Sequence, residues 1–223
     1  MNILVAVVYL LSTFILTTLC YKFYGKNGLY IWICVNIIIS NIQTVKISEF
    51  MGLTTSLGNI SYASIFLATD IINEKYGIEA NKLGVKLSFI IMCIFSILMT
   101  LFLQFEPSKF DTSQDALNVI FGYIPRITLS SLTAYFISQT FDAYAYAYLK
   151  RRFNILWLSN NGSTFMSQTV DTFIFTILAF IGTMPISEML EIMVTMLIFK
   201  YIIAILDTPF MYIVKNIKKV NEL

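Results

Sequence analysis

Histidine is absent from this 223-residue chain, and charged residues make up only 13% of it. The absence of histidine excludes His-dependent proteolysis and most zinc chemistry. The chain also lacks a Gly-rich phosphate-binding loop. Its three cysteines, Cys20, Cys34 and Cys93, lie in apolar runs and form no Cys-x-x-Cys pair, so they predict neither a disulfide nor a metal site. We therefore expect no enzyme, no metal and no cofactor.

The scarcity of charge is matched by an abundance of apolar residues. Hydrophobic residues make up 57% of the chain, and the mean hydropathy is +0.76. Soluble domains have roughly a quarter charged residues. The formal net charge of +2 is too small to imply a nucleic-acid partner. The composition predicts a single integral membrane domain, residues 1–223, that crosses the cell membrane several times and has the lipid bilayer as its main partner.

Long apolar runs divide the chain into segments that each approach the length of a membrane-spanning helix. We expect an all-α bundle of about seven spans. The third run is the weakest, because it ends in polar residues before a predicted helix stop at Gly77, and it could be tilted, broken or partly re-entrant. The first run lacks the features of a cleaved signal peptide, so we expect a retained helix. The segments are 2–21, 29–45, 58–74, 84–104, 126–149, 163–183 and 190–213.

Lysine and arginine alternate between the connections of these segments. Of the 15 basic residues, 11 fall in connections on one side and three on the other, while Lys200 lies within the last segment. Basic residues accumulate on the cytoplasmic side of membrane proteins. This bias predicts an outside N-terminus and a cytoplasmic C-terminus. The longest outside connection, 106–124, carries three acidic residues and reads as a solvated loop.

The pentapeptide Ser-Gln-Thr-x-Asp occurs twice, at 138–142 and 167–171, each time within an apolar run. A carboxylate in a membrane usually faces the bundle interior or a water-filled cavity, where it has a partner or a function. Asp142 and Asp171 each lie eight residues from the predicted cytoplasmic end of their helix, which corresponds to about 12 Å. We therefore predict that the two acids lie at the same depth on neighbouring antiparallel helices.

Further polar residues interrupt the other segments. Together with Gln and Asn amides, such carboxylates could hold a polar planar solute, with Phe and Tyr rings stacked on its faces. Other roles stay open: amides often bond helices together, and Lys200 or Arg126 could form structural ion pairs. Glu74 could lie at the cytoplasmic interface, and Tyr144, Tyr146 and Tyr148 are expected in an interfacial belt. Asp207 lies two residues before Pro209, where we predict a kink. The interrupting residues include Asn41, Asp70, Glu74, Arg126, Lys200 and Asp207.

Taken in order, several of these motifs resemble the queuosine precursor transporter family. They are Tyr62-Ala-Ser-Ile-Phe-Leu-Ala-Thr-Asp70-Ile-Ile-Asn-Glu74-Lys-Tyr-Gly77, Arg126, Ala134-Tyr-Phe-Ile-Ser-Gln139-Thr-Phe-Asp142, Trp157, Ser167-Gln-Thr-Val-Asp171, Lys200 and Thr208-Pro209-x-x-Tyr212. The resemblance implies uptake of a 7-deazaguanine base such as preQ0, preQ1 or queuine. It also implies a six-helix core, residues 29–215, similar to the substrate-binding subunits of energy-coupling-factor transporters, with residues 1–26 as an additional helix. One departure is Ala63, where the family often has proline.

The resemblance places substrate-binding roles on eight positions, and the polar run of the second segment adds Asn41. A carboxylate can accept from the adjacent N–H and amino groups of a guanine-like edge, and an amide can pair with its other atoms. Three alternatives remain: uptake of another vitamin or nucleobase-like solute, an intramembrane hydrolase using Asp142 and Asp171, or a passive scaffold. Proton coupling and an energising ATPase partner are both compatible with the sequence. The nine candidate positions are Asn41, Asp70, Glu74, Arg126, Gln139, Asp142, Gln168, Asp171 and Lys200.

Overall fold

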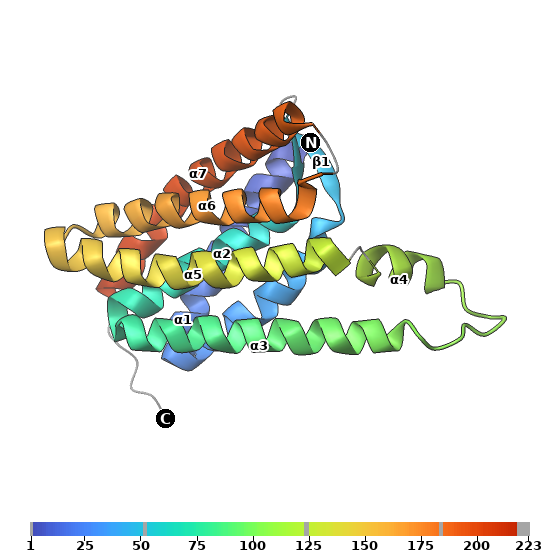
Figure 1. Ribbon diagram of the computed structural model, residues 1–223. Coiled ribbons are helices and arrows are strands. Elements are labelled where there is room, and N and C mark those ends of the chain that lie inside the picture. Colours follow the sequence, from blue (N-terminus) through green and yellow to red (C-terminus); the bar gives the residue numbers. More distant parts are fainter. Residues whose placement is uncertain (1, 51–52, 123–124, 183–184, 218–223) are drawn as a thin grey trace.

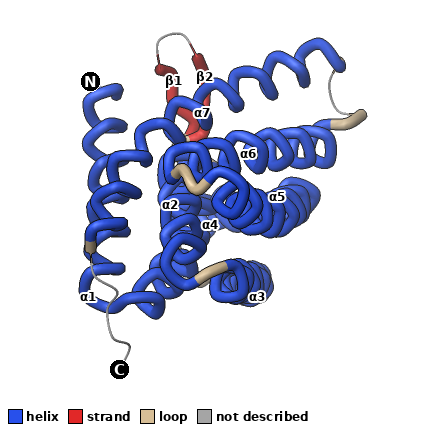
Figure 2. Tube along the Cα trace, turned by 90° about the vertical axis from the view of Figure 1, so that its left-hand side faces the viewer, coloured by secondary structure: helices blue, strands red, loops and turns tan. Residues whose placement is uncertain are grey.

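The computed structural model describes residues 2–50, 53–122, 125–182 and 185–217, and it is a helical bundle (Figure 1). This architecture confirms the predicted all-α membrane fold. Figure 2 looks nearly along α3, α5 and α6 and shows them packed side by side. The elements are α1 Asn2–Thr44, β1 Ile47–Phe50, β2 Leu53–Ser56, α2 Gly58–Tyr76, α3 Ile78–Phe102, α4 Gln114–Phe121, α5 Pro125–Phe153, α6 Leu156–Phe180 and α7 Ile186–Asn216.

Helix α1 contains the first two predicted spans, 2–21 and 29–45, and a break separates them. Gly25 has φ 57° and ψ −137°, a conformation outside the helical region that glycine adopts readily because it lacks a Cβ atom. The two halves fold back on each other, so that the Nε2 atom of Gln43 donates to the hydroxyl of Tyr9 at 2.8 Å. The break at Gly25 thus divides α1 into the two antiparallel helices of a hairpin, as the two separate apolar runs predicted.

Helix α2 is the centre of the bundle and contacts α1, α3, α5 and α7. It is a continuous helix, so the broken alternative for the third segment is wrong. The chain leaves the helix at Gly77, where φ is 85° and the N–H still bonds to the carbonyls of Ile72 and Asn73. Every residue from Ser64 to Asn73 is buried. Burial on all sides explains why polar residues survive in this span, because they meet protein rather than lipid.

Three elements were not predicted. The short strands β1 and β2 pair antiparallel between α1 and α2, and α4 interrupts the predicted loop 106–124. Phe121 at the end of α4 packs edge-to-face on Phe95 of α3, with ring centroids 5.9 Å apart, and this contact with a distant residue is invisible to local periodicity. The acidic residues of the loop are exposed, as expected. There, hydrogen bonds from Ser113 lower the pKa of Asp111 below its usual value.

The outside of the bundle is apolar, and its interior holds both hydrophobic and polar side chains. Large exposed hydrophobic side chains cover α1, α3 and α7, whereas the interior contains many buried Ser, Thr, Asn and Asp residues. Among the described residues, three helices are long and apolar enough to cross a membrane on length and composition alone, and these are α1, α3 and α7. The polar interior residues lie chiefly on α2, α5 and α6. This distribution fits a multi-pass membrane protein whose outer helices face lipid.

The basic clusters that were assigned to one side of the membrane do lie at one end of the bundle. Lys75 in the last turn of α2 donates to the carbonyl of Lys215 at 3.0 Å, and Lys26 lies 5.5 Å from the ring centre of Tyr76. Lys150 near the end of α5 forms an ion pair with Glu74. These contacts join the α1 break, the α2–α3 turn, the α5–α6 turn and the end of α7, which we call the lysine-rich end.

Candidate functional site

The two Ser-Gln-Thr-x-Asp segments bind each other crosswise. Ser138 Oγ donates to Asp171 Oδ1 at 3.0 Å, and Ser167 Oγ donates to Asp142 Oδ1 at 2.8 Å. Each serine is therefore level with the aspartate of the other helix, and the two carboxylates are offset by four residues, or about 6 Å. The predicted matched depth is wrong. The reason is that α6 begins at Leu156, not at residue 163, so the end used to measure depth was misplaced.

Asp171 is fully engaged by neighbouring side chains. Its carboxylate accepts from Lys200 Nζ at 2.6 Å, from the Tyr62 hydroxyl at 3.0 Å and from Ser138. Lys200 also donates to Thr172 at 3.1 Å, and its ammonium lies 5.7 Å from the Tyr62 ring centre. Both charged side chains are nearly buried. A buried ion pair with such additional bonds ties α2, α5, α6 and α7 together at one level.

Three other carboxyl groups lie together and form what we call the acid cluster: Asp70 on α2, Asp142 on α5 and Asp207 on α7. Their exposed fractions are 0%, 0% and 2%. The three carboxyl groups are close enough to interact electrostatically. Asp70 Oδ1 and Asp142 Oδ2 have no hydrogen-bond partner among the described residues. Neighbouring carboxylates repel each other, so this arrangement favours a proton on at least one of them.

Neutral side chains supply the remaining bonds of the acid cluster. Asn160 Nδ2 donates to Asp207 Oδ1 at 2.6 Å, and Thr164 Oγ1 donates to Asp70 Oδ2 at 3.3 Å. In the described part of the chain, no basic side chain forms an ion pair with these three acids. The cluster is thus a buried group of acids whose charge is balanced by protons or by a bound cation.

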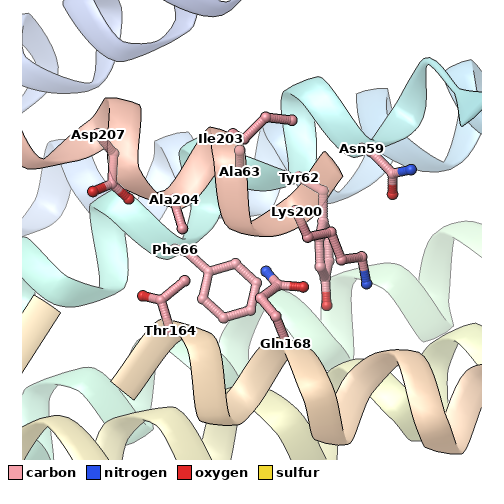
Figure 3. Close-up of a pocket in the computed structure, with 10 residues that line it drawn as sticks. All are labelled: Asn59, Tyr62, Ala63, Phe66, Thr164, Gln168, Lys200, Ile203, Ala204 and Asp207. Atoms are coloured by element: carbon pink, nitrogen blue, oxygen red, sulfur yellow. The ribbon is translucent and has the colours of Figure 1, made fainter. Parts of the chain in front are cut away.

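A pocket opens between α2, α6 and α7 beside the acid cluster (Figure 3). Figure 3 shows the Gln168 side chain pointing from α6 into this pocket. The Oε1 atom of Gln168 is buried without a hydrogen-bond partner among the described residues. The cavity volume is about 10 Å³, room for about one water molecule. The pocket is lined by Asn59, Tyr62, Ala63, Phe66, Thr164, Gln168, Lys200, Ile203, Ala204 and Asp207.

Of the nine predicted positions, the structure places Gln168 and Lys200 on the pocket wall and Asp70, Asp142 and Asp171 beside it. Glu74 lies further along α2, at the lysine-rich end. It accepts from the Tyr146 hydroxyl at 2.9 Å. Tyr146 is fully buried while Tyr144 and Tyr148 are exposed, so the predicted aromatic belt is wrong for Tyr146, which lies one helical turn after Asp142 on the same face.

Asn41 and Gln139 are not among the described residues that line the pocket, and neither is Glu74. Asn41 donates to the Ile37 carbonyl in its own helix at 2.9 Å. Gln139 is 1% exposed, and neither of its amide atoms has a partner among the described residues. Arg126 belongs to the first turn of α5, and its side chain lies outside the described residues. Local sequence alone could not separate these positions from Gln168.

Several residues that line the pocket are not among the nine predicted positions. Tyr62 and Phe66 form its aromatic wall, with ring centroids 5.4 Å apart. Asp207, which the sequence analysis named only as a polar residue within the last span, closes the pocket on α7. Asn160 was missed because the sixth segment was assumed to begin at residue 163, which put the Asn160-Asn161 pair outside the membrane. The sequence does contain a signal, namely the two adjacent polar pairs Asn160-Asn161 and Asp207-Thr208. In the structure the first pair, on α6, donates to the second pair, on α7, and both hydrogen bonds are 2.6 Å long.

Comparison with known proteins shows the family to which the chain belongs. A family model described as "Putative vitamin uptake transporter" matches residues 56–214, which include the whole of α2 and all acids described above. A Bacillus subtilis (strain 168) protein named "Probable queuosine precursor transporter" is 43% identical over 206 residues, covering 91% of this chain and 90% of that protein. No solved structure matches. The chain belongs to this family of membrane uptake transporters, in agreement with the resemblance seen in its motifs.

Proposed function

We propose that this transporter imports a 7-deazapurine precursor of queuosine into the cell, and that the pocket between α2, α6 and α7 binds the base. The name of the 43% identical relative supports the choice of substrate. The observation that carries the site is Gln168: a buried amide oxygen that lines the pocket without a partner among the described residues. An unbonded buried acceptor costs free energy unless a ligand supplies the missing donor.

The chemistry of the pocket suits a guanine-like edge. Such an edge presents adjacent ring N–H and amino donors, and Asp207 and Gln168 offer acceptors on opposite walls. Asp207 Oδ1 is held by Asn160, which leaves Oδ2 to accept from the ligand. Tyr62 and Phe66 supply ring faces for stacking on a planar base. Lys200 is neutralised by Asp171, so its role is to position the pocket wall and not to bind an anion.

The pocket must open before a base can enter, since its cavity of about 10 Å³ holds no more than a water molecule. We assign this opening to α7, which supplies four of the lining residues. Pro209 lies inside α7, two residues after Asp207. A proline removes one backbone hydrogen bond of a helix and weakens it there, so α7 can bend next to the acid that it carries.

The orientation and energy source follow as part of this proposal. The basic-residue bias places the lysine-rich end in the cytoplasm. The carboxyl groups of the acid cluster can bind and release protons, which suits proton coupling. Uptake energised by an ATPase partner is the alternative. We do not favour the hydrolase, because Asp171 is occupied by Lys200 and is offset from Asp142.

The test uses cells that cannot make queuosine precursors and that depend on this protein for uptake. preQ0, preQ1 and queuine are supplied separately, and the queuosine content of tRNA is measured. We expect at least one precursor to restore queuosine, and Gln168→Ala and Asp207→Asn to lower uptake at least tenfold. Gln104→Ala and Asp111→Asn, which change exposed residues of the same types, serve as matched controls.

The outcomes separate substrate from site. If no precursor restores queuosine with the wild-type protein in the membrane, the substrate is wrong, and binding of other vitamins and nucleobases is measured next. If the wild type works and both pocket variants work equally well, the pocket is wrong.

A further inference from the structure

A second cavity lies on the outside of the bundle, away from the pocket. It is a groove of about 460 Å³ between α3 and α5, lined by Lys82, Val85, Lys86, Phe89, Ile90, Phe136, Thr140 and Tyr144. None of these residues belongs to the acid cluster or to the pocket. Both helices expose large apolar side chains on this side, so the groove faces the lipid of the membrane.

The groove is polar at one end and apolar at the other. Lys82 and Lys86 lie in the first turns of α3, at the lysine-rich end, and Tyr144 lies opposite on α5. Farther along the two helices, Phe89 and Phe136 pack with ring centroids 4.8 Å apart. The distance along α3 from Lys82 to Ile90 is about 12 Å. A phosphate-bearing headgroup with a hydrocarbon chain has the same division of polarity.

The two lysines have unequal partners. Lys82 pairs with Glu79 at 2.9 Å and lies 4.5 Å from the Tyr144 ring centre. Lys86 is exposed, and among the described residues it forms no ion pair and no hydrogen bond. It lies eight residues into a spanning helix, about 12 Å from its start. An ammonium at that depth on a lipid-facing surface needs an anion or must extend to the interface.

We propose that this groove, lined by Lys82 and Lys86, binds an anionic phospholipid, with its phosphate on the lysines and one acyl chain along Phe89, Ile90 and Phe136. Basic recesses between spanning helices are the kind of surface that recognises anionic headgroups. The charge complementarity is specific to this groove, because the neighbouring lysine Lys150 is already bound to Glu74. The site is independent of the solute that the transporter carries.

The test is native mass spectrometry of the purified full-length protein with added phosphatidylglycerol or phosphatidylcholine. We expect the wild type to retain phosphatidylglycerol preferentially. The double variant Lys82→Gln/Lys86→Gln should bind it about 30-fold more weakly, on the scale of two lysine–headgroup contacts. Ile90→Trp should weaken binding by filling the apolar end. Arg151→Gln/Arg152→Gln removes two exposed charges at the same end of the bundle and should leave binding unchanged.

Four results would overturn the proposal. They are equal retention of both lipids by the wild type, equal losses in the lysine and arginine double variants, equal binding of soluble glycerol phosphate, and occupation of the groove by a second copy of the chain. The last would appear as a dimer that the Ile90→Trp variant dissociates. Because folding is checked for each variant by thermal unfolding and lipid binding needs no transport, these outcomes do not depend on the identity of the solute.

Discussion

The hydroxyl of Ser167 donates a 2.8 Å hydrogen bond to Asp142, the aspartate of the other Ser-Gln-Thr-x-Asp segment. The reciprocal bond joins Ser138 to Asp171. The repeated motif therefore works as an interhelical clamp that sets the register of α5 against α6. This register determines which acid meets Lys200 and which acid meets Asp70, so a motif with two identical copies produces two different environments.

Removing the serines should have unequal effects. Ser167→Ala deprives Asp142 Oδ1 of its donor and should cost about 1–3 kcal/mol of unfolding free energy. Ser138→Ala should cost less, because Asp171 keeps Tyr62 and Lys200. Thermal unfolding in detergent measures both, with the exposed Ser12→Ala as control. Equal effects of the two substitutions would contradict the asymmetric clamp.

The buried ion pair predicts a rescue. Asp171→Asn should strongly destabilise the protein, by about 3–5 kcal/mol, because it leaves the Lys200 ammonium buried without its counter-ion. The double variant Asp171→Asn/Lys200→Met removes the unpaired charge and should recover most of the stability. Membrane yield and thermal unfolding are the measurements. An Asp171→Asn protein as stable as the wild type would mean that Lys200 finds another partner.

The contact between Asp70 and Asp142 predicts tolerance of a neutral mimic. Asp70→Asn supplies an N–H donor to Asp142 in place of the shared proton, so stability should stay within about 1 kcal/mol of the wild type. Asp70→Ala supplies no donor and leaves a cavity, and it should cost about 2–4 kcal/mol. Thermal unfolding distinguishes the two. If Asp70→Asn is as damaging as Asp70→Ala, the two carboxyl groups do not share a proton.

Asp70→Asn, which should preserve stability, should impair transport. If the shared proton moves during the cycle, Asp70→Asn should retain solute binding but lose uptake driven by a pH gradient, because an amide cannot release its proton. Counterflow and gradient-driven uptake in liposomes separate binding from coupling. Full gradient-driven uptake by a folded Asp70→Asn protein would remove the acid cluster from energy coupling.

The contact of α1 with α2 should be sensitive to added bulk at Gly58. A Cβ atom there would lie 2.4 Å from Thr44 Oγ1 and 2.5 Å from the Ser40 carbonyl oxygen, which is backbone. Gly58→Ala should therefore cost about 1–3 kcal/mol. Gly162→Ala is the control, since its Cβ would meet the end of the flexible Leu149 side chain at 2.9 Å, which can move. Thermal unfolding compares them, and equal losses would contradict a rigid contact at Gly58.

Some features of the fold could be predicted from local sequence, and others could not. Gly77 was read correctly as the stop of α2, because a left-handed glycine after a helix is a local signal. The grouping of basic residues at one end was also correct, since charge asymmetry depends only on the number and order of spans. By contrast, the pairing of Asp171 with Lys200 joins residues 29 apart, and the sequence left it open whether Lys200 or Arg126 would form such an ion pair.

The depth error at Asp142 and Asp171 shows where such reasoning stopped. It came from placing the start of α6 at residue 163, which left Asn160 and Asn161 outside the predicted span. In the folded protein these amides bond to Asp207 and Thr208 of α7. Whether a polar residue can lie inside a membrane thus depends on its partner, and the partner is set by helix packing.

The order of residues was enough to predict the membrane class, the order of the spans, the end at which the lysines gather and the presence of acids in the interior. Hydropathy and charge are properties of each segment, so they can be read without knowledge of the fold. Helix packing was needed to show that Asp171 binds Lys200, that Asp70 and Asp142 lie together, and that Gln168 and Asp207 line one pocket. Those relationships depend on the register and rotation of neighbouring helices, which side-chain packing across the whole bundle determines.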